Sequence, residues 1–247
     1  MKKVKIFILG LIFVFSVVSC EKTSVEDEFE SVNGQVVEKL IKRIEGKDAI
    51  GENGSILFNY NGDNKVSIIS YGSTTTTFNY NSLGELISYS TTGYPGDEPK
   101  PFSMSELYQA PYDVFDNGEV LEKDNNNNPI KILVYDQGDS SKYYIGDILY
   151  DDKPNPFFYT IKSSSMLDVL DRSYLNFGYQ IPEIVKAKDL LPNNIVTGMI
   201  FKDSDGITVA ELQIDYTYDK HNYPIRGDVF IYEDGESKNN YINFYYK

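Results

Sequence analysis

Residues 211–218 read ELQIDYTY, and polar and apolar side chains alternate along this stretch without a break. A period of two is typical of a β-strand with one buried face, because successive side chains point to opposite sides of a sheet. The stretch therefore predicts a half-buried strand. Its buried face is expected to carry Leu212, Ile214, Tyr216 and Tyr218.

Similar short segments occur along most of the chain. We expect further strands at residues 39–44, 55–60, 65–71, 74–80, 86–90, 130–135, 157–162, 197–201, 228–232 and 240–246. Turns rich in Asn, Asp and Gly separate them, as hairpin connections require. The sequence thus predicts a mainly β fold, a single antiparallel meander sheet that is curved or partly closed. Residues 166–170 and 183–188 are compatible with one or two short helical excursions.

Internal repeats support the hairpin interpretation. The sequence FNYN occurs at residues 58–61 and again at 78–81, each time before a polar turn and an aliphatic strand, so one hairpin is expected twice. Asn128, Asn155 and Asn222 each stand one or two residues before a Pro. Because Pro fixes φ, we expect these turns to hold strand register rather than a ligand.

The first twenty residues have the pattern of a targeting signal. A basic start, MKKVK, precedes an apolar run at residues 6–18, and residues 17–20 read VVSC. This ending resembles the lipobox of bacterial lipoproteins, which implies that Cys20 becomes the N-terminus and carries acyl chains such as palmitate. An uncleaved transmembrane helix is the alternative, but an apolar run of about thirteen residues is short of the about 20 that a span needs.

These features divide the chain into a lipoprotein signal peptide (1–19), an acidic tether (20–38) and a β-sheet domain (39–247). Residues 21–33, EKTSVEDEFESVN, are acidic and lack strand alternation, which indicates a flexible tether. Acidic residues soon after the acylated Cys also resemble the surface-export signals of Bacteroidota lipoproteins. We expect an outer-membrane location, either at the cell surface or at the periplasmic face.

Composition argues against several functional classes. Loss of the leader removes three lysines and no acid, which leaves 20 basic against 37 acidic side chains. Such a surface repels phosphate, so nucleic acid is not an expected partner. A single Cys and a single His provide no Cys/His zinc cluster and no disulfide. We expect no cofactor, and we expect His221 to be a structurally neutral turn residue.

Metal binding and catalysis have weak support in the sequence. The loops at residues 203–206 (DSDG) and 124–128 (DNNNN) contain oxygen ligands, but neither completes an EF-hand, and Asx-rich hairpin turns explain both. Weak calcium binding stays open. Adjacent acids such as Asp151 and Asp152 do not define the cleft that a carboxylate-dependent hydrolase needs. We therefore expect no catalytic residues and no enzymatic activity.

Three segments carry a resemblance to a protein family. Residues 150–157 (YDDKPNPF), 191–196 (LPNNIV) and 216–224 (YTYDKHNYP) resemble a group of Bacteroidota lipoproteins with no established activity, and the tyrosine-rich strands are similar to the YD repeats of Rhs-type proteins. The resemblance covers about residues 39–247 and implies a β-sheet lipoprotein. The chain lacks the long repeat array of Rhs shells, so the resemblance does not imply that it encloses a toxin.

Tyrosine is abundant, with 21 residues, and its ring can stack on a sugar while its hydroxyl hydrogen-bonds. Most of these residues fit half-buried sheet positions, so the first candidates for ligand contact are those outside the strands: Tyr94, Tyr108, Tyr112 and Tyr174. The sequence predicts a membrane-anchored, non-catalytic β-domain that binds a glycan or protein partner. The alternative is a carboxylate-dependent enzyme acting on a polysaccharide.

Overall fold

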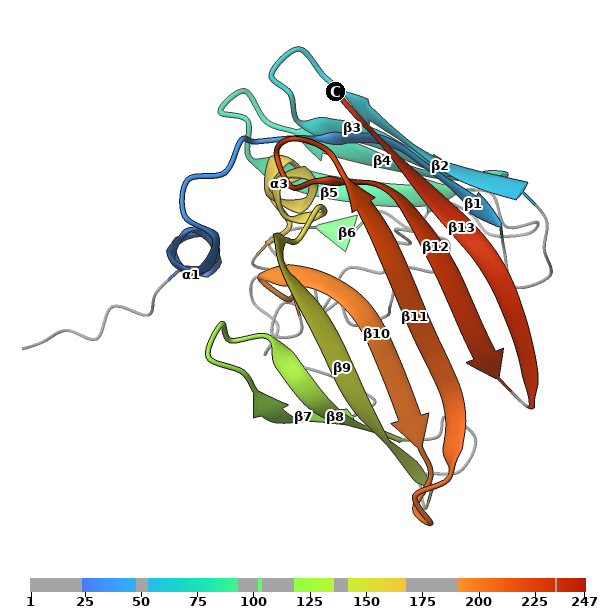
Figure 1. Cartoon of the computed structure of the whole chain (residues 1–247). Helices are drawn as coiled ribbons and strands as arrows, with labels where there is room; N and C mark the ends of the chain where they lie inside the picture. The colour runs from blue at the N-terminus through green and yellow to red at the C-terminus, as the bar shows by residue number, and fades with distance from the viewer. Residues whose placement is uncertain are drawn as a thin grey trace, which may run out of the picture.

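The computed structural model describes residues 24–47, 53–92, 102–103, 118–135, 142–167, 191–233 and 235–247. Strands dominate these residues (Figure 1). They are β1 (Ile41–Lys47), β2 (Asn53–Tyr60), β3 (Val66–Tyr71), β4 (Thr74–Tyr80), β5 (Leu86–Thr92), β6 (Phe102–Ser103), β7 (Gly118–Lys123), β8 (Pro129–Tyr135), β9 (Tyr143–Pro154), β10 (Asn194–Lys202), β11 (Thr208–Tyr218), β12 (Pro224–Glu233) and β13 (Glu236–Tyr246). The helices are α1 (Val25–Asn33) and α3 (Phe158–Ser163).

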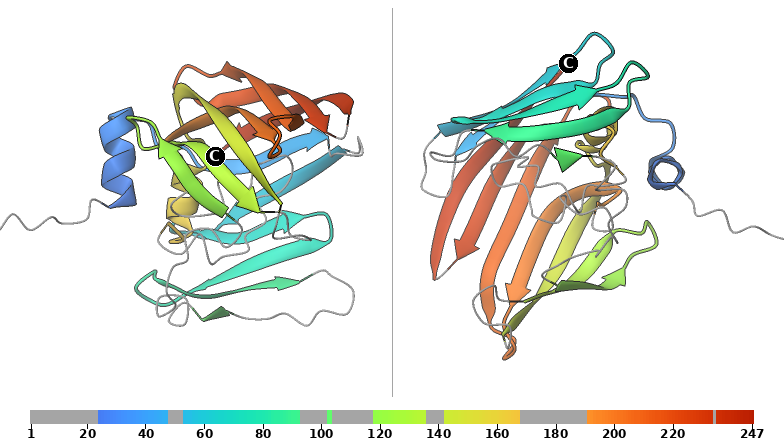
Figure 2. Two further views of the ribbon diagram at one scale, coloured as in Figure 1. Left: turned by 90° about the horizontal axis from the view of Figure 1, so that it is seen from below. Right: turned by 180° about the vertical axis from the view of Figure 1, so that it is seen from behind.

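The strands form one thirteen-stranded sheet in the order β6-β5-β4-β3-β2-β1-β13-β12-β11-β10-β9-β8-β7. Strands that follow one another in the chain pair in antiparallel fashion, except β6 and β7, which form the two edges, and β1 pairs with β13 in the middle of the sheet. The sheet curves strongly and encloses α3 on its concave side (Figures 1 and 2). The predicted mainly β, curved antiparallel meander is therefore confirmed.

The concave face of the sheet carries the hydrophobic core. Alternate residues of each strand point into it, among them Ile44, Phe58, Phe78 and Ile242, and all four are at most 4% exposed. Gly227 also lies on this face. A Cβ atom there would lie 2.7 Å from Ile214 Cγ2 and 2.8 Å from Ile242 Cγ2. Glycine therefore lets neighbouring side chains crowd the inside of the bend.

Five hairpin turns share one hydrogen-bond pattern, at residues 61–65, 81–85, 124–128, 203–207 and 219–223. In each, the side-chain oxygen of the first residue, Asn or Asp, accepts from the backbone N–H groups of the third and fifth residues. The fourth residue always has a positive φ, between 59° and 79°, and is Asn or Gly. The expected Asx-rich turns and the repeated hairpin are thus present.

Tyrosine hydroxyls connect neighbouring hairpins at the same end of the sheet. Tyr60 and Tyr80 donate to the backbone oxygens of Ile41 and Val66, each at 2.6 Å. Tyr150 and Tyr246 donate in the same way to the oxygens of Pro129 and Pro224. Burial raises the pKa of Tyr60 to about 12, so this hydroxyl stays a protonated donor even near pH 10, where a free tyrosine ionises.

The strand predicted at residues 157–162 is wrong, because these residues belong largely to α3. Asn155 forms a turn in which its side-chain oxygen accepts from the N–H of Phe157 at 3.0 Å, and α3 follows directly. Four consecutive residues, Phe158 to Ile161, are buried, so the segment lacks the alternation of a half-buried strand. Of the two predicted short helices, residues 183–188 and most of 166–170 lie outside the described residues.

The acidic segment that precedes the sheet also differs from its predicted flexible state. Residues Val25–Asn33 form α1, whose N-cap Ser24 and N3 residue Asp27 make a reciprocal capping box. Phe29 in the middle of α1 is fully buried. The proposed boundaries of signal peptide, tether and domain stay predictions. Among the described residues, no helix has the length and apolar character needed to cross a membrane.

Candidate functional site

The outward side of β2–β5 carries no charged side chain, and we call it the hydroxyl face. It is formed by side chains on the convex side of these four strands, opposite the buried residues: Ser55, Leu57, Asn59, Ile68, Ser70, Thr75, Thr77, Asn79, Ile87, Ser88, Ser90 and Thr92. The whole chain is 24% charged. In residues 53–92 the only charged residues are Asp63, Lys65 and Glu85, and all lie in the Asx turns.

Strand register arranges eight of these side chains in two parallel rows. One row is Leu57, Ser70, Thr75 and Thr92, which are successive cross-strand partners. The other row is Asn59, Ile68, Thr77 and Ser90. Neighbours in a row are about 4.8 Å apart, and the rows are about 6.8 Å apart, as sheet geometry requires. The face is therefore a regular array of hydroxyl, amide and methyl groups.

The polar groups of this array are largely available. Asn79 donates to Ser88 at 3.2 Å, and Thr92 donates to the backbone oxygen of Thr75 at 3.4 Å. The hydroxyls of Ser70, Thr77 and Ser90 make no hydrogen bond to another described residue. The aromatic rings of the same strands lie on the other side of the sheet: Phe58, Tyr60, Phe78, Tyr80 and Tyr89.

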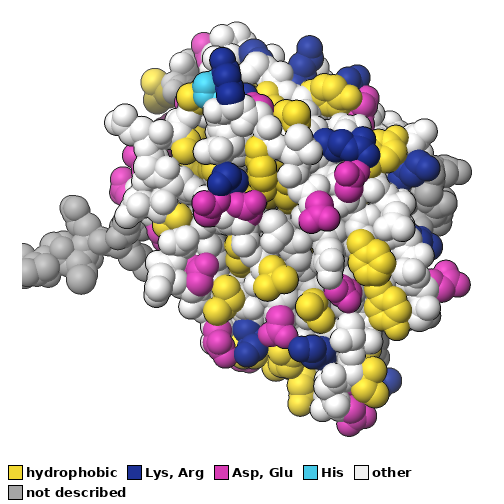
Figure 3. All heavy atoms as spheres, viewed as in Figure 1, with side chains coloured by type: hydrophobic (Ala, Val, Ile, Leu, Met, Phe, Trp, Pro, Cys, Tyr) yellow, Lys and Arg dark blue, Asp and Glu magenta, His cyan; other side chains and the backbone are white. Residues whose placement is uncertain are grey.

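The rest of the outer surface has a different character. On β1, β12 and β13 charged groups pair with each other and with aromatic rings: Arg43 lies 4.1 Å from the centre of the Tyr245 ring, and Glu45 accepts the Tyr245 hydroxyl at 2.8 Å. That hydrogen bond raises the pKa of Tyr245. Figure 3 shows charged side chains distributed among apolar ones over the face formed by β9–β13.

Asp151 and Asp152, the adjacent acids weighed for catalysis, have structural partners, and so does Asp219 of the nearby β11–β12 turn. Asp151 accepts the Tyr218 hydroxyl at 2.8 Å, and Asp152 pairs with Lys153, which lowers the pKa of Asp152. Burial raises the pKa of Asp219, but hydrogen bonds from Lys39 and from two backbone N–H groups outweigh it, so the net shift is downward. A general acid of a glycosidase needs the opposite shift. The carboxyls of Asp152 and Asp219 therefore offer no support for the hydrolase alternative.

The Asn-rich segments singled out in the sequence meet in one buried network. The side-chain oxygen of Asn128 accepts the backbone N–H groups of Asn193 and Asn194, at 2.8 and 3.1 Å. Asn155 donates to the backbone oxygen of Pro192 at 2.8 Å. All four asparagines are at most 5% exposed. Their contacts hold β8, β9 and β10 together, as expected of residues that fix register.

The two loops considered for calcium both form the shared Asx turn, in which Asp124 and Asp203 accept backbone N–H groups. Among the described residues, no three His, Cys, Asp or Glu side chains come together as a metal site. A pocket of about 290 Å³ beside the second loop is lined by Lys142, Tyr143, Tyr144, Asp203, Ser204 and Val209. One carboxylate oxygen of Asp203 already accepts the backbone N–H groups of Asp205 and Ile207, so this oxygen is occupied by the turn.

Several predicted site residues lie outside the described residues. They are Cys20 and the four tyrosines proposed for ligand contact, Tyr94, Tyr108, Tyr112 and Tyr174. The hydroxyl face was missed because its members are ordinary strand residues. A signal was nevertheless present: a long β-patterned stretch whose few charges all fall in turns.

Comparisons with known proteins give no family. No protein-family model matches the chain, and no curated protein matches it. Solved structures with 10% identity include a porin-like protein from Bacteroides uniformis (84% of this chain, 96% of the other, TM-score 0.37) and one from Bacteroides vulgatus (85% and 99%, 0.36). A third is a putative outer membrane lipoprotein-sorting protein domain from Vibrio parahaemolyticus (90% and 89%, 0.31).

Proposed function

We propose that this protein is an outer-membrane lipoprotein whose β-sheet domain binds a neutral polysaccharide on the hydroxyl face. The lipidation part of the proposal rests on the basic, apolar and VVSC segments that end at Cys20. Acylation of Cys20 would hold the domain at a membrane, since each buried methylene contributes about 0.8 kcal/mol. The role proposed for the domain is binding, without catalysis.

We infer the class of ligand from one observation, which is that the two rows of the hydroxyl face contain no charged side chain. An anionic polymer needs cationic partners, and this face has none in a chain of formal net charge −14. A neutral polysaccharide presents hydroxyls that both donate and accept, and the side chains of Ser70, Thr77 and Ser90 do the same. Leu57, Ile68 and Ile87 add apolar contact for the C–H groups of sugar rings.

A protein partner fits the same face less well. Binding energy at protein interfaces is concentrated in Trp, Tyr and Arg side chains that fill pockets on the partner. The hydroxyl face has none of these residue types, because its strands direct their rings into the core. Small hydroxyl side chains spread over four strands instead favour many weak contacts with a long, uncharged polymer.

Affinity electrophoresis tests the proposal with the full-length protein in detergent. The gels contain one neutral polymer each (dextran, laminarin, hydroxyethylcellulose or mannan) or an anionic one (polygalacturonate or heparin). We expect at least one neutral polymer to retard the protein. Thr77→Lys should abolish the retardation, because it puts a long cationic side chain in the middle of one row.

Thr217→Lys is the matched control, since Thr217 is an exposed threonine on the outer side of β11, opposite Arg226. It should leave the retardation unchanged. The ligand assignment is wrong if no neutral polymer retards the protein, if only anionic polymers do, or if both lysine variants weaken binding equally.

A further inference from the structure

Helix α1 is attached to the sheet domain by an aromatic contact. The ring of Phe29 stacks on Phe158 of α3 with 3.7 Å between centroids, and the ring of Tyr159 meets it edge-on at 5.7 Å. Phe29 and Phe158 are at most 1% exposed. The contact therefore removes the only large apolar side chain of the acidic segment 26–30 from water.

Polar contacts on both sides of Phe29 fix the helix further. Glu26 pairs with Lys162 of α3, and Glu28 accepts hydrogen bonds from Asn127 and Asn193. At the C-terminal end of α1, Asn33 donates to the backbone oxygen of Asn193 at 3.0 Å. A nine-residue helix is marginal in isolation, so these contacts are what keep it formed.

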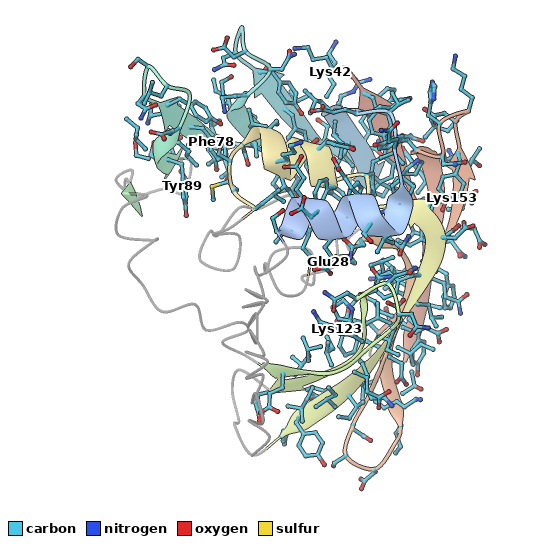
Figure 4. The ribbon with its side chains drawn as sticks, turned by 90° about the vertical axis from the view of Figure 1, so that its left-hand side faces the viewer. Glu28, Lys42, Phe78, Tyr89, Lys123 and Lys153 are labelled. Carbon is cyan, nitrogen blue, oxygen red and sulfur yellow. The ribbon has the colours of Figure 1, made fainter. Side chains whose placement is uncertain are left out.

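The contacts of α1 place it at one particular end of the sheet (Figure 4). Asn127 belongs to the turn between β7 and β8. At its own C-terminal end, α3 approaches two further hairpins: Ser164 accepts from Tyr80, and Ser165 accepts from Lys65, each at 3.5 Å. The turns β2–β3, β4–β5, β7–β8 and β11–β12 all lie at this end, which we call the turn end. The turn at residues 203–207 lies at the opposite end, because it joins the other ends of β10 and β11.

We infer that the turn end is the surface of the protein that faces the lipid membrane. The inference rests on the lipidation of Cys20 in the proposed function. Three residues separate Cys20 from the N-cap Ser24, so the chain between their two Cα atoms spans at most about 14 Å. A free chain from Cys20 to β1 at Ile41 would instead reach about 70 Å. Because α1 is docked, the chain between Cys20 and the folded domain is short, and it joins the domain at one end of the sheet.

This orientation has a consequence for the hydroxyl face. The strands run from the turn end to the opposite end, and eleven residues of β11 extend for about 35 Å. The hydroxyl face lies along the side of β2–β5, so it rises from the membrane surface and stays accessible to a polymer outside it. The turn at residues 203–207 becomes the membrane-distal tip.

The absence of Trp from the chain allows a direct test. Leu83 at the β4–β5 turn and Ile207 at the distal turn are both well exposed, at 82% and 61%, so Leu83→Trp and Ile207→Trp place one fluorophore at each end. The full-length, acylated variants are reconstituted into phosphatidylethanolamine vesicles that contain dansyl-labelled lipid as energy acceptor. We expect energy transfer several-fold larger from the Leu83→Trp variant.

Adding Phe29→Ala to both variants should bring the ratio of the two transfer efficiencies toward one, because α1 is then released. Far-ultraviolet circular dichroism checks that the sheet remains folded. A ratio near one with Phe29 intact, in protein that floats with the vesicles, overturns the orientation and leaves the anchor standing. Protein that does not float with the vesicles overturns the anchor, and the orientation with it.

Discussion

Phe29 and Phe158 stack with their ring planes 5° apart, which joins a helix from the acidic N-terminal segment to a helix inside the curved sheet. The stacked pair sits within the same hydrophobic cluster as Ile41 and Met166. The segment that looks like a tether in the sequence is therefore packed against the domain over Val25–Asn33.

Phe29→Ala should release α1 without unfolding the sheet. Removal of a buried Phe costs about 3 to 5 kcal/mol, which exceeds what a short helix can compensate. Hydrogen exchange should show the amides of α1 exchanging like an unfolded peptide while those of β11–β13 stay protected. Ser31→Ala, at an exposed position of α1, should leave all of them protected. Continued protection of α1 in Phe29→Ala would refute the docking.

Gly227→Ala should destabilise the protein by about 1 to 3 kcal/mol, since the new methyl group would overlap Ile214 and Ile242 on the concave face. Urea denaturation gives the change in unfolding free energy. Gly62→Ala is the control, because no atom lies within 4 Å of a Cβ at that turn position. Its effect should stay within about 0.5 kcal/mol. Equal effects of the two substitutions would argue against crowding on the concave face.

Tyr223→Phe should stabilise the protein by up to about 1 kcal/mol. The Tyr223 side chain is fully buried, and its hydroxyl has no hydrogen-bond partner among the described residues, so it loses water without compensation. Tyr246→Phe is the opposite case, because the Tyr246 hydroxyl donates to the Pro224 oxygen at 2.8 Å. It should cost about 1 kcal/mol. Thermal melts that rank the two variants in the reverse order would contradict these assignments.

Asp219→Asn should flatten the acid side of the stability curve. The pKa of Asp219 is lowered in the folded state, so its contribution is present above the unfolded pKa near 3.9 and is lost as pH falls through the folded value. Asn keeps the turn acceptor, as Asn61 and Asn81 do, but loses the pairing with Lys39. We expect a loss of about 1 kcal/mol at pH 7 that shrinks below about pH 4. If the difference in unfolding free energy between the wild type and Asp219→Asn stayed constant across this pH range, the ion pair with Lys39 would not be the source of the stability loss.

The sequence predicts much of the sheet because alternation and turn chemistry are local properties. Residues 211–218 became part of β11, and the two FNYN segments became matching hairpins closed by Asx turns. It fails at residues 157–162, where four consecutive buried residues and β-branched or aromatic types are compatible with either structure. Prediction from the sequence fails also at α1, because a single Phe in an acidic stretch does not reveal that Phe158 of α3 will stack on it.

The candidate site illustrates the same limit. The scarcity of charge in residues 53–92 is visible in the sequence, but the two rows depend on register between strands, which alternation alone does not fix. Thr77 and Ser90 become neighbours only through the pairing of β4 with β5. The four tyrosines proposed from the sequence, Tyr94, Tyr108, Tyr112 and Tyr174, lie outside the described residues and stay predictions.

Titration calorimetry of the full-length protein with the polysaccharide that retards it in gels measures whether the uncharged hydroxyl face binds an uncharged polymer. We expect a Kd that changes less than about twofold between about 20 mM and about 500 mM NaCl, because salt screens only charges. Thr77→Lys should raise this Kd at least about tenfold, or about 1.4 kcal/mol, while Thr217→Lys leaves it unchanged. A Kd that rises steeply with salt, or a Thr77→Lys protein that binds as tightly as the wild type, would show that the hydroxyl face does not bind a neutral polysaccharide.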